Sequence, residues 1–320
     1  MKTDALNRRL RFAPPNPQVS RLVLTDLDYL VFEAINRHGP LPTHYLFEFV
    51  KDRRRDYARF QNRLTEFYNG DSAGAYLTRP PQQFAGFEAR YQHLVYDLTA
   101  RAKGVLAERG TLARFSPRRV EPFLHQLMQA CVGASLELAA RADGLRYISR
   151  EEILTNRKCP AATRDLANPL ALPVHLVGAQ KAITPDDVFG LQGFDDKGDW
   201  FRFFALEIDR NTESIERRDP TQNAFGRKIV GYLDILNRQT FREHFGIPNL
   251  SVLTVTTNAV HAANIIEFLA RQHPGRHAGR FLFACEPAFG SNWRVPKTVL
   301  APLITQPWTG VNGRRLISEP

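Results

Sequence analysis

The chain has 320 residues, of which 43% are hydrophobic, and this length and composition predict two globular domains. Three widely spaced cysteines, Cys131, Cys159 and Cys285, argue against a disulfide framework and against a paired-cysteine metal site, and they favour a reducing compartment. No apolar run approaches the roughly 18 residues of a membrane span, and the first residues lack the apolar core of a signal peptide. We therefore expect a cytoplasmic protein without a membrane partner.

The formal charge of +10 is concentrated in the N-terminal third. Residues 1–120 hold 20 of the 43 lysines and arginines but only 12 of the 33 acidic residues, which amounts to +8 of the total. A localised basic region is typical of proteins that neutralise phosphates on nucleic acid. The alternative is a basic surface that serves only solubility.

Three short helices are predicted in this basic third. Thr25 is an N-cap candidate for the first helix, which should end near Gly39. Thr43 is a candidate cap for a short second helix. The third should begin between Asp52 and Asp56 and end at Tyr68, before the Asn-Gly pair at 69–70.

The third helix has two distinct faces. One carries Tyr57, Phe60, Leu64 and Phe67, and the other carries Arg55, Arg59 and Arg63 at a spacing of four residues. A hairpin at 75–78 and 95–98 and a helix at 99–108 follow. Three helices followed by a hairpin are typical of a winged helix, which we place at residues 20–115.

Double-stranded DNA, at a specific origin or operator site, is the partner that this module predicts. The expected DNA-binding residues lie on the second helix and around the start of the third: Thr43, His44, Arg53, Arg54, Arg55, Arg59 and Arg63. The alternative for the arginine run at 53–55 is a solvated, charged helix face.

Residues 116–320 predict a second, α/β domain. A helix at 120–142 is mainly core. Glu137 on it could support a metal site, and the alternative is a surface or capping role. Strands at 182–190 and 200–210 should be joined by a turn at 196–199. A helix at 223–236, a strand at 250–256, a helix at 259–271 and a last strand at 281–285 complete a mixed sheet with helices on both faces.

Acidic residues gather at the ends of two of these strands. Glu207 and Asp209 project from the same face of one strand, and a paired neighbour could bring Asp186 beside Glu207. Crowded carboxylates repel one another unless a cation compensates, so the three are candidate ligands for Mg²⁺ or Mn²⁺. The alternative is that Asp186 and Asp209 are surface residues at strand ends.

The pattern Pro185-Asp186, Glu207-Ile208-Asp209 and a helix bearing Lys228 resembles the PD-(D/E)xK restriction-endonuclease-like core. Together with the N-terminal module, the segments 185–186, 204–210 and 226–232 are similar to the replication-relaxation family of plasmid and mobile-element proteins, which includes relaxases of the MobC type. The similarity spans roughly residues 22–260.

The resemblance implies a metal-dependent activity that cuts or relaxes DNA during plasmid replication or mobilisation. It implies that Asp186 and Glu207 bind the metal. Asp209 takes the position of the usual strand lysine, so either Lys228 on the helix compensates, or Asp209 is a further ligand, or the site is weak or inert. Tyr232, four residues after Lys228, is either a nucleophile or a packed tyrosine with a hydrogen-bonded tip.

Two functions follow. The first is a DNA nickase or relaxase in which Asp186, Glu207, Asp209, Lys228 and Tyr232 form the catalytic site with Mg²⁺ or Mn²⁺ as cofactor. The second is a non-catalytic DNA-binding replication accessory or transcriptional regulator with an inert nuclease-like core. A homodimer and a role for the basic tail at 313–316 stay open.

Overall fold

The computed structural model describes residues 15–18, 20–84, 92–115, 122–175, 182–210, 225–289 and 295–319. The chain divides into two compact units, one of residues 1–134 with 295–299 and the other of residues 135–294 with 300–320. This division falls within a long helix, whereas the sequence placed the domain boundary before that helix, at residue 115.

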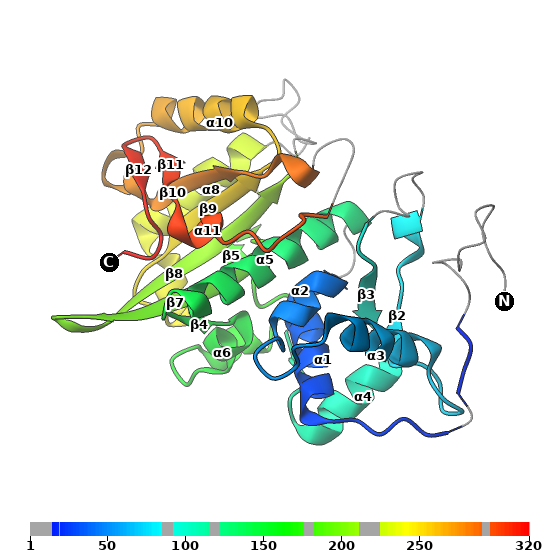
Figure 1. Cartoon of the computed structure of the whole chain (residues 1–320). Helices are drawn as coiled ribbons and strands as arrows, with labels where there is room; N and C mark the ends of the chain where they lie inside the picture. Colours follow the sequence, from blue (N-terminus) through cyan, green and yellow to red (C-terminus); the bar gives the residue numbers. More distant parts are fainter. Residues whose placement is uncertain are drawn as a thin grey trace. The chain divides into compact units, whose positions relative to one another are not determined.

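The described part of the first unit is mainly helical and contains one small sheet (Figure 1). Its elements are α1 (Asp26–His38), β1 (Leu41–Pro42), α2 (Thr43–Glu48), α3 (Tyr57–Asn69), β2 (Leu77–Thr78), the 3₁₀ helix η1 (Pro81–Phe84), β3 (Val95–Leu98), α4 (Ala100–Arg109) and the first part of α5 (Phe123–Ala142). The strand order is β1-β3-β2, and both pairings are antiparallel.

Local sequence signals account for the helix ends of this unit. Thr25 and Asp28 form a capping box at the start of α1, and Gly39 follows its end at a positive φ of 104°. Asp56 caps α3 by accepting a hydrogen bond of 3.0 Å from the backbone of Arg59. The predicted first helix, third helix and hairpin are confirmed.

The starts of the second and third helices each differ from the prediction in one detail. Thr43 is the first residue of α2 and not its cap, because its hydroxyl donates to the carbonyl of Leu94 across the sheet at 2.9 Å. The helix α3 begins at Tyr57, so the arginine run at 53–55 lies in the turn before it. The backbone N–H groups of Arg53 and Arg54 close this turn on the carbonyl of Val50.

The second unit is built on a large mixed sheet (Figure 1). Beyond α5 its elements are β4 (Arg146–Ile148), α6 (Arg150–Thr155), α7 (Ala161–Arg164), β5 (Leu172–Pro173), β6 (Ala182–Ile183), β7 (Asp187–Asp195), β8 (Gly198–Asp209), α8 (Phe225–Arg238), α9 (Thr240–Phe245), β9 (Ser251–Thr256), α10 (Ala259–Arg271), η3 (Gly275–Arg280), β10 (Phe281–Cys285), η4 (Pro287–Phe289), α11 (Pro302–Thr305), β11 (Trp308–Gly310) and β12 (Gly313–Arg315).

Within the described ranges, seven strands form this sheet, in the order β12-β11-β10-β9-β8-β7-β4. The hairpin β7–β8 is antiparallel, whereas β8, β9 and β10 run parallel and are connected through α8 and α10. The predicted order of strands and helices from residue 182 to 285 is present, but the first predicted strand, 182–190, is divided. Ala182–Ile183 (β6) pairs with β5 outside the large sheet, and β7 begins at Asp187. The predicted starts at residues 120 and 223 lie outside the described residues.

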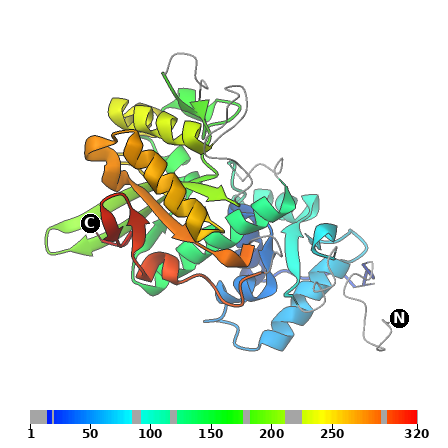
Figure 2. The same cartoon turned by 90° about the horizontal axis from the view of Figure 1, so that it is seen from above.

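The two connecting helices cover one face of the sheet. Figure 2 shows α8 in yellow beside α10 in orange, and the two helices contact each other. On the opposite face, Phe204, Leu206 and Ile208 of β8 are also buried. Because both faces are covered here, a polar residue in this part of β8 is enclosed by protein.

The prediction that residues 281–285 form the last strand is wrong. Trp308 and the residues around it form β11, which pairs with β10, and the basic tail at 313–315 forms the exposed edge strand β12. The two strands are short, and a charged edge strand of this kind disfavours pairing with another chain.

Candidate functional site

Three predicted site residues in the second unit, Asp186, Lys228 and Tyr232, lie around a fourth, Glu207. We call these four residues the Glu207 cluster. Glu207 lies near the end of β8, and its side chain is 1% exposed. The hairpin register places Asp186 next to it, since the N–H of Asp186 donates to the carbonyl of Leu206 at 3.0 Å. The structure thus places Asp186 near Glu207, as the strand pairing predicted.

Helix α8 provides the two partners of the Glu207 carboxylate. Lys228 Nζ lies 2.8 Å from Glu207 Oε2, and the Tyr232 hydroxyl donates to Oε1 at 2.5 Å. The spacing of four residues puts both side chains on one helix face, directed to the sheet. Gly231 lies between them, where a Cβ atom would come within 2.2 Å of Ile183, so its small size permits the close packing of α8.

Burial and neighbouring charges act in opposite directions on Glu207. Burial raises the pKa of its carboxyl, the Lys228 ammonium opposes the rise, and the Asp186 carboxylate adds to it. With both acids ionised, Asp186, Glu207 and Lys228 sum to one negative charge. The cluster can therefore accept one further cation.

Tyr232 is a packed tyrosine in this arrangement. Its side chain is fully buried, and burial together with the Glu207 carboxylate raises the pKa of its phenol well above the ordinary value. A phenol that stays protonated and donates to a carboxylate is a poor nucleophile. This geometry corresponds to the second of the two alternatives that the sequence left open.

The side chain of Asp209 is bonded to a different partner from those of Glu207. Its side chain is buried and accepts a hydrogen bond of 2.6 Å from Nε2 of His261, in the first turn of α10. Within the described ranges, no group of three or more His, Cys, Asp or Glu side chains is arranged to hold a metal ion. The structure therefore does not arrange the three predicted carboxylates as one group of metal ligands.

The carboxylates of Asp186 and Glu207 are still a suitable donor set for Mg²⁺ or Mn²⁺. Mg²⁺ is commonly held by one or two carboxylates, with water and substrate phosphate completing its shell. Thr254, the register partner of Glu207 on β9, has a buried hydroxyl without a hydrogen-bond partner in the part of the chain that the structure describes. An unsatisfied oxygen beside the Glu207 carboxylate fits a site for a hydrated cation.

Sequence reasoning missed Thr254 and His261. His261 follows the parallel strand β9 and begins α10, where Asn258 caps the helix by accepting from the backbone N–H groups of Val260 and His261. A strand–helix turn after a parallel strand lies at the carboxyl edge of the sheet, where β8 also ends. This topology could have predicted the contact of His261 with Asp209.

Three of the predicted DNA-binding residues have protein partners instead. Thr43 is buried and bonded to Leu94. His44 Nε2 bonds the carbonyl of Pro296 at 2.7 Å, and burial together with His93 lowers the pKa of His44 to about 4. Arg63 pairs with Asp28 and Glu66 at 2.8 Å, and its side chain is only 17% exposed.

The remaining arginines are open to solvent. Arg53, Arg55 and Arg59 are exposed, and Arg54 is half-buried. Arg59 has an exposed side chain that also lies 3.3 Å from Asp56. The candidate phosphate contacts of the first unit therefore lie in the turn before α3 and on its first turn.

No helix in the described residues is long and apolar enough to cross a membrane. Glu137 is buried and pairs with Arg141 one helical turn away, which contradicts a surface role. Its support of a metal stays a prediction.

The profile of the replication-relaxation family matches residues 32–250, a range that includes the whole Glu207 cluster. No curated protein and no solved structure matches the chain. The matched range is more than half of the 320 residues. The chain therefore belongs to the replication-relaxation family, which associates it with plasmid replication and mobile elements.

Proposed function

We propose that this protein binds double-stranded DNA through a winged helix in its first unit and nicks one strand at the Glu207 cluster with Mg²⁺ or Mn²⁺. The convergence of Asp186, Glu207 and Lys228 is the observation that carries this proposal. Two carboxylates beside a lysine are the residues that strand cleavage by a nuclease-like core requires, and the family membership is consistent with a DNA substrate.

The fold and the exposed arginines of the first unit support the proposed DNA binding. The order α1-β1-α2-α3-β2-β3 and the three-stranded sheet β1-β3-β2 are typical of a winged helix. Exposed Arg55 and Arg59 flank the start of α3, the helix that enters the groove in such modules. Each of them would neutralise a phosphate and so make DNA affinity depend on salt.

The residues of the Glu207 cluster would have different roles in cleavage of the phosphodiester bond. Lys228 is the member whose side chain is 29% exposed while Glu207 is enclosed, so its ammonium can reach a phosphate oxygen and stabilise developing negative charge. Glu207 and Tyr232 hold that lysine and each other in place. Asp186 Oδ2 accepts the N–H of Ile208 at 2.6 Å, which fixes its carboxylate at the same strand end.

Asp186 and Glu207 are the residues that would hold the divalent ion. When bound, such an ion activates water and neutralises the leaving oxygen of the cut strand.

A second function is favoured by a different observation. Both oxygens of Glu207 are bonded, to Lys228 and to Tyr232, and this internal pairing can stabilise the buried acid without a metal. The protein would then be a non-catalytic DNA-binding replication accessory.

Isosteric variants separate the two functions. Asp186→Asn and Glu207→Gln should abolish divalent-dependent nicking of a supercoiled plasmid with the cognate origin, while the exposed hairpin variant Asp196→Asn should nick like the wild type. In parallel, Arg55→Gln with Arg59→Gln should weaken binding of the same origin fragment and reduce its salt dependence, compared with Arg21→Gln. A wild-type protein that binds Mn²⁺ no better than Glu207→Gln in calorimetry would favour the second function.

A further inference from the structure

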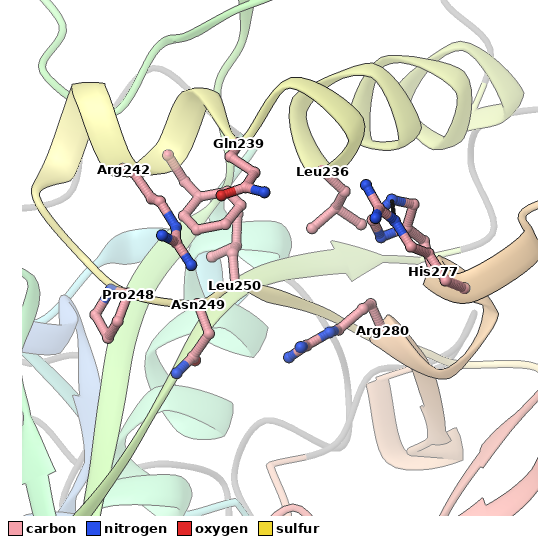
Figure 3. Close-up of a pocket in the computed structure, with 10 residues that line it drawn as sticks. Leu236, Gln239, Arg242, Pro248, Asn249, Leu250, His277 and Arg280 are labelled. Carbon is pink, nitrogen blue, oxygen red and sulfur yellow. Dashed lines mark hydrogen bonds between the residues drawn. The ribbon is translucent and has the colours of Figure 1, made fainter.

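A pocket of about 340 Å³ opens at the other end of the parallel strands from the Glu207 cluster. Figure 3 shows Arg242 and Arg280 extending into the same space from different elements. The pocket is lined by Leu236, Gln239, Phe241, Arg242, Pro248, Asn249, Leu250, Arg276, His277 and Arg280, and we call it the Arg242 pocket.

Strand topology separates this pocket from the Glu207 cluster. Leu250 immediately precedes β9, and Arg280 immediately precedes β10, so the pocket lies at the amino edge of the parallel strands. Glu207 is level with Thr254, four residues further along β9 than Leu250. At roughly 3.3 Å per residue, the two sites are about 13 Å apart along the strand.

The charge of the lining is unbalanced. Among the described residues that line the pocket, three are arginines, which contribute positive charge, and none has a carboxylate. Among the described residues, no ion pair joins Arg242, Arg276 or Arg280 to an acid. Burial lowers the pKa of His277, and the charges of Arg276 and Arg280 lower it further, as expected in a positive field.

The end of α8 does not balance this charge. A helix C-terminus has a partial charge of about half an electron, which is much smaller than three guanidinium charges. The acid nearest in sequence on that helix, Asp234, pairs with Arg238 at 2.9 Å and not with a lining arginine. An anion is therefore the partner that this lining lacks.

The lining also has a fixed shape. Asn249 donates to the carbonyl of Phe201 at 2.9 Å and accepts from the N–H of Phe203 at 3.0 Å, so the rim before β9 is attached to β8. Gln239 has the left-handed backbone φ of 59°, which is uncommon for a residue other than glycine and recurs at ligand clamps. Leu236, Phe241 and Leu250 add an apolar floor.

We propose that the Arg242 pocket binds a phosphate group, carried by a nucleotide or by a nucleic-acid strand. Arginine forks match phosphate oxygens in two-point contacts, and the apolar floor suits the sugar or base attached to the phosphate. The volume lies at the lower end of the range of small-molecule sites, about 300–1,000 Å³, and so suits a ligand of nucleotide size. The proposal does not depend on DNA cleavage, because no residue of the Glu207 cluster lines the pocket.

The test uses the full chain with Arg55→Gln and Arg59→Gln in every sample, so that DNA binding by the first unit is reduced. Inorganic phosphate, thymidine monophosphate and a short fluorescent oligothymidylate are titrated by calorimetry or anisotropy. The pocket variant adds Arg242→Gln and Arg280→Gln. The control instead adds Arg271→Gln and Arg314→Gln, two exposed arginines outside the lining, which gives the same change in charge.

We expect the pocket variant to lose at least about tenfold in affinity and the control to stay within about twofold. Circular dichroism should show that both variants are folded, since the substituted residues are not buried. Thymidine monophosphate that binds and is displaced by inorganic phosphate identifies a nucleotide ligand, whereas binding of the oligothymidylate alone identifies a strand phosphate. Equal affinities of the pocket variant and the control, or no binding of any probe by the parent protein, would overturn the proposal.

Discussion

Arg63 shows how one residue can follow a surface pattern and still be structural. The helical spacing groups it with Arg55 and Arg59, but its guanidinium reaches Asp28 of α1 and stacks on Phe67 at 4.4 Å from the ring centre. Asp28 is buried, so it needs a cation, and helical periodicity cannot identify a partner that is 35 residues away. The sequence therefore predicted the face of α3 but not which arginine is used internally.

Substitution of Arg63 should consequently affect stability more than DNA binding. In Arg63→Gln the buried Asp28 carboxylate loses its charged partner, and we expect a loss of about 1–3 kcal/mol in the free energy of unfolding. Urea denaturation measures this loss. Arg59→Gln, on the exposed first turn of the same helix, is the matched control and should change stability by less than about 0.5 kcal/mol.

Glu207 should make stability depend on pH. Because the folded protein holds the pKa of Glu207 above its ordinary value of 4.5, the folded state binds the proton more tightly than the unfolded state. Its contribution is fully present below pH 4.5 and is lost as the pH rises through the raised pKa. The free energy of unfolding of the wild type should therefore fall relative to that of Glu207→Gln as the pH rises above 4.5.

Urea denaturation of both proteins at several pH values from 4 to 8 provides the measurement. A constant difference between wild type and Glu207→Gln over this range would mean that the pKa of Glu207 is not raised by folding.

Helices and strands were easier to predict from the sequence than the contacts between them. Alternating apolar residues and a turn predicted β7 and β8, and caps and helical periodicity predicted α1, α3 and α10. The strands β11 and β12 were missed because each has three residues, too few for a periodic signal. The partner of Asp209 was missed because His261 is distant in sequence and becomes a neighbour only through the parallel pairing of β8 and β9.

The buried ion pair between α6 and β7 also joins two residues that are distant in sequence. Arg150 lies 3.0 Å from Asp187, and both side chains are 7% exposed. Removing one member of a buried pair leaves an uncompensated charge, so Arg150→Met should destabilise the protein by about 3–5 kcal/mol. Chemical denaturation checks this value, and the double variant Arg150→Met with Asp187→Leu should recover part of the loss.

The position of Gly246, after α9 and close to the backbone of Lys158, requires a residue without a side chain. It follows α9 with φ of 71°, and a Cβ atom there would lie 2.2 Å from the carbonyl oxygen of Lys158. Gly246→Ala should lower the melting temperature, since neither the backbone conformation nor the neighbouring carbonyl can adapt cheaply. Gly198→Ala, which also has a positive φ but open space around it, separates the conformational cost from the steric one.

At the scale of the whole molecule, the chain combines a basic unit with exposed arginines and an α/β unit with a buried acidic cluster. The positive charge of the first 120 residues and the carboxylates near the end of β8 were both visible in the sequence. The second unit also has a basic site of its own, the Arg242 pocket, whose residues come from three separate segments. Charge counting alone did not reveal it, because residues beyond 120 are nearly balanced in charge.

The central claim is that the Glu207 cluster cuts DNA, and plasmid nicking tests it most directly. Supercoiled plasmid with the cognate origin is incubated with wild type or Glu207→Gln across a range of Mg²⁺ and Mn²⁺ concentrations. The amount of open-circular plasmid is then measured on gels. We predict open-circle product with wild type that requires the divalent ion and is absent with Glu207→Gln. Equal nicking by the two proteins, or no nicking by a wild type that binds the plasmid, would contradict the claim.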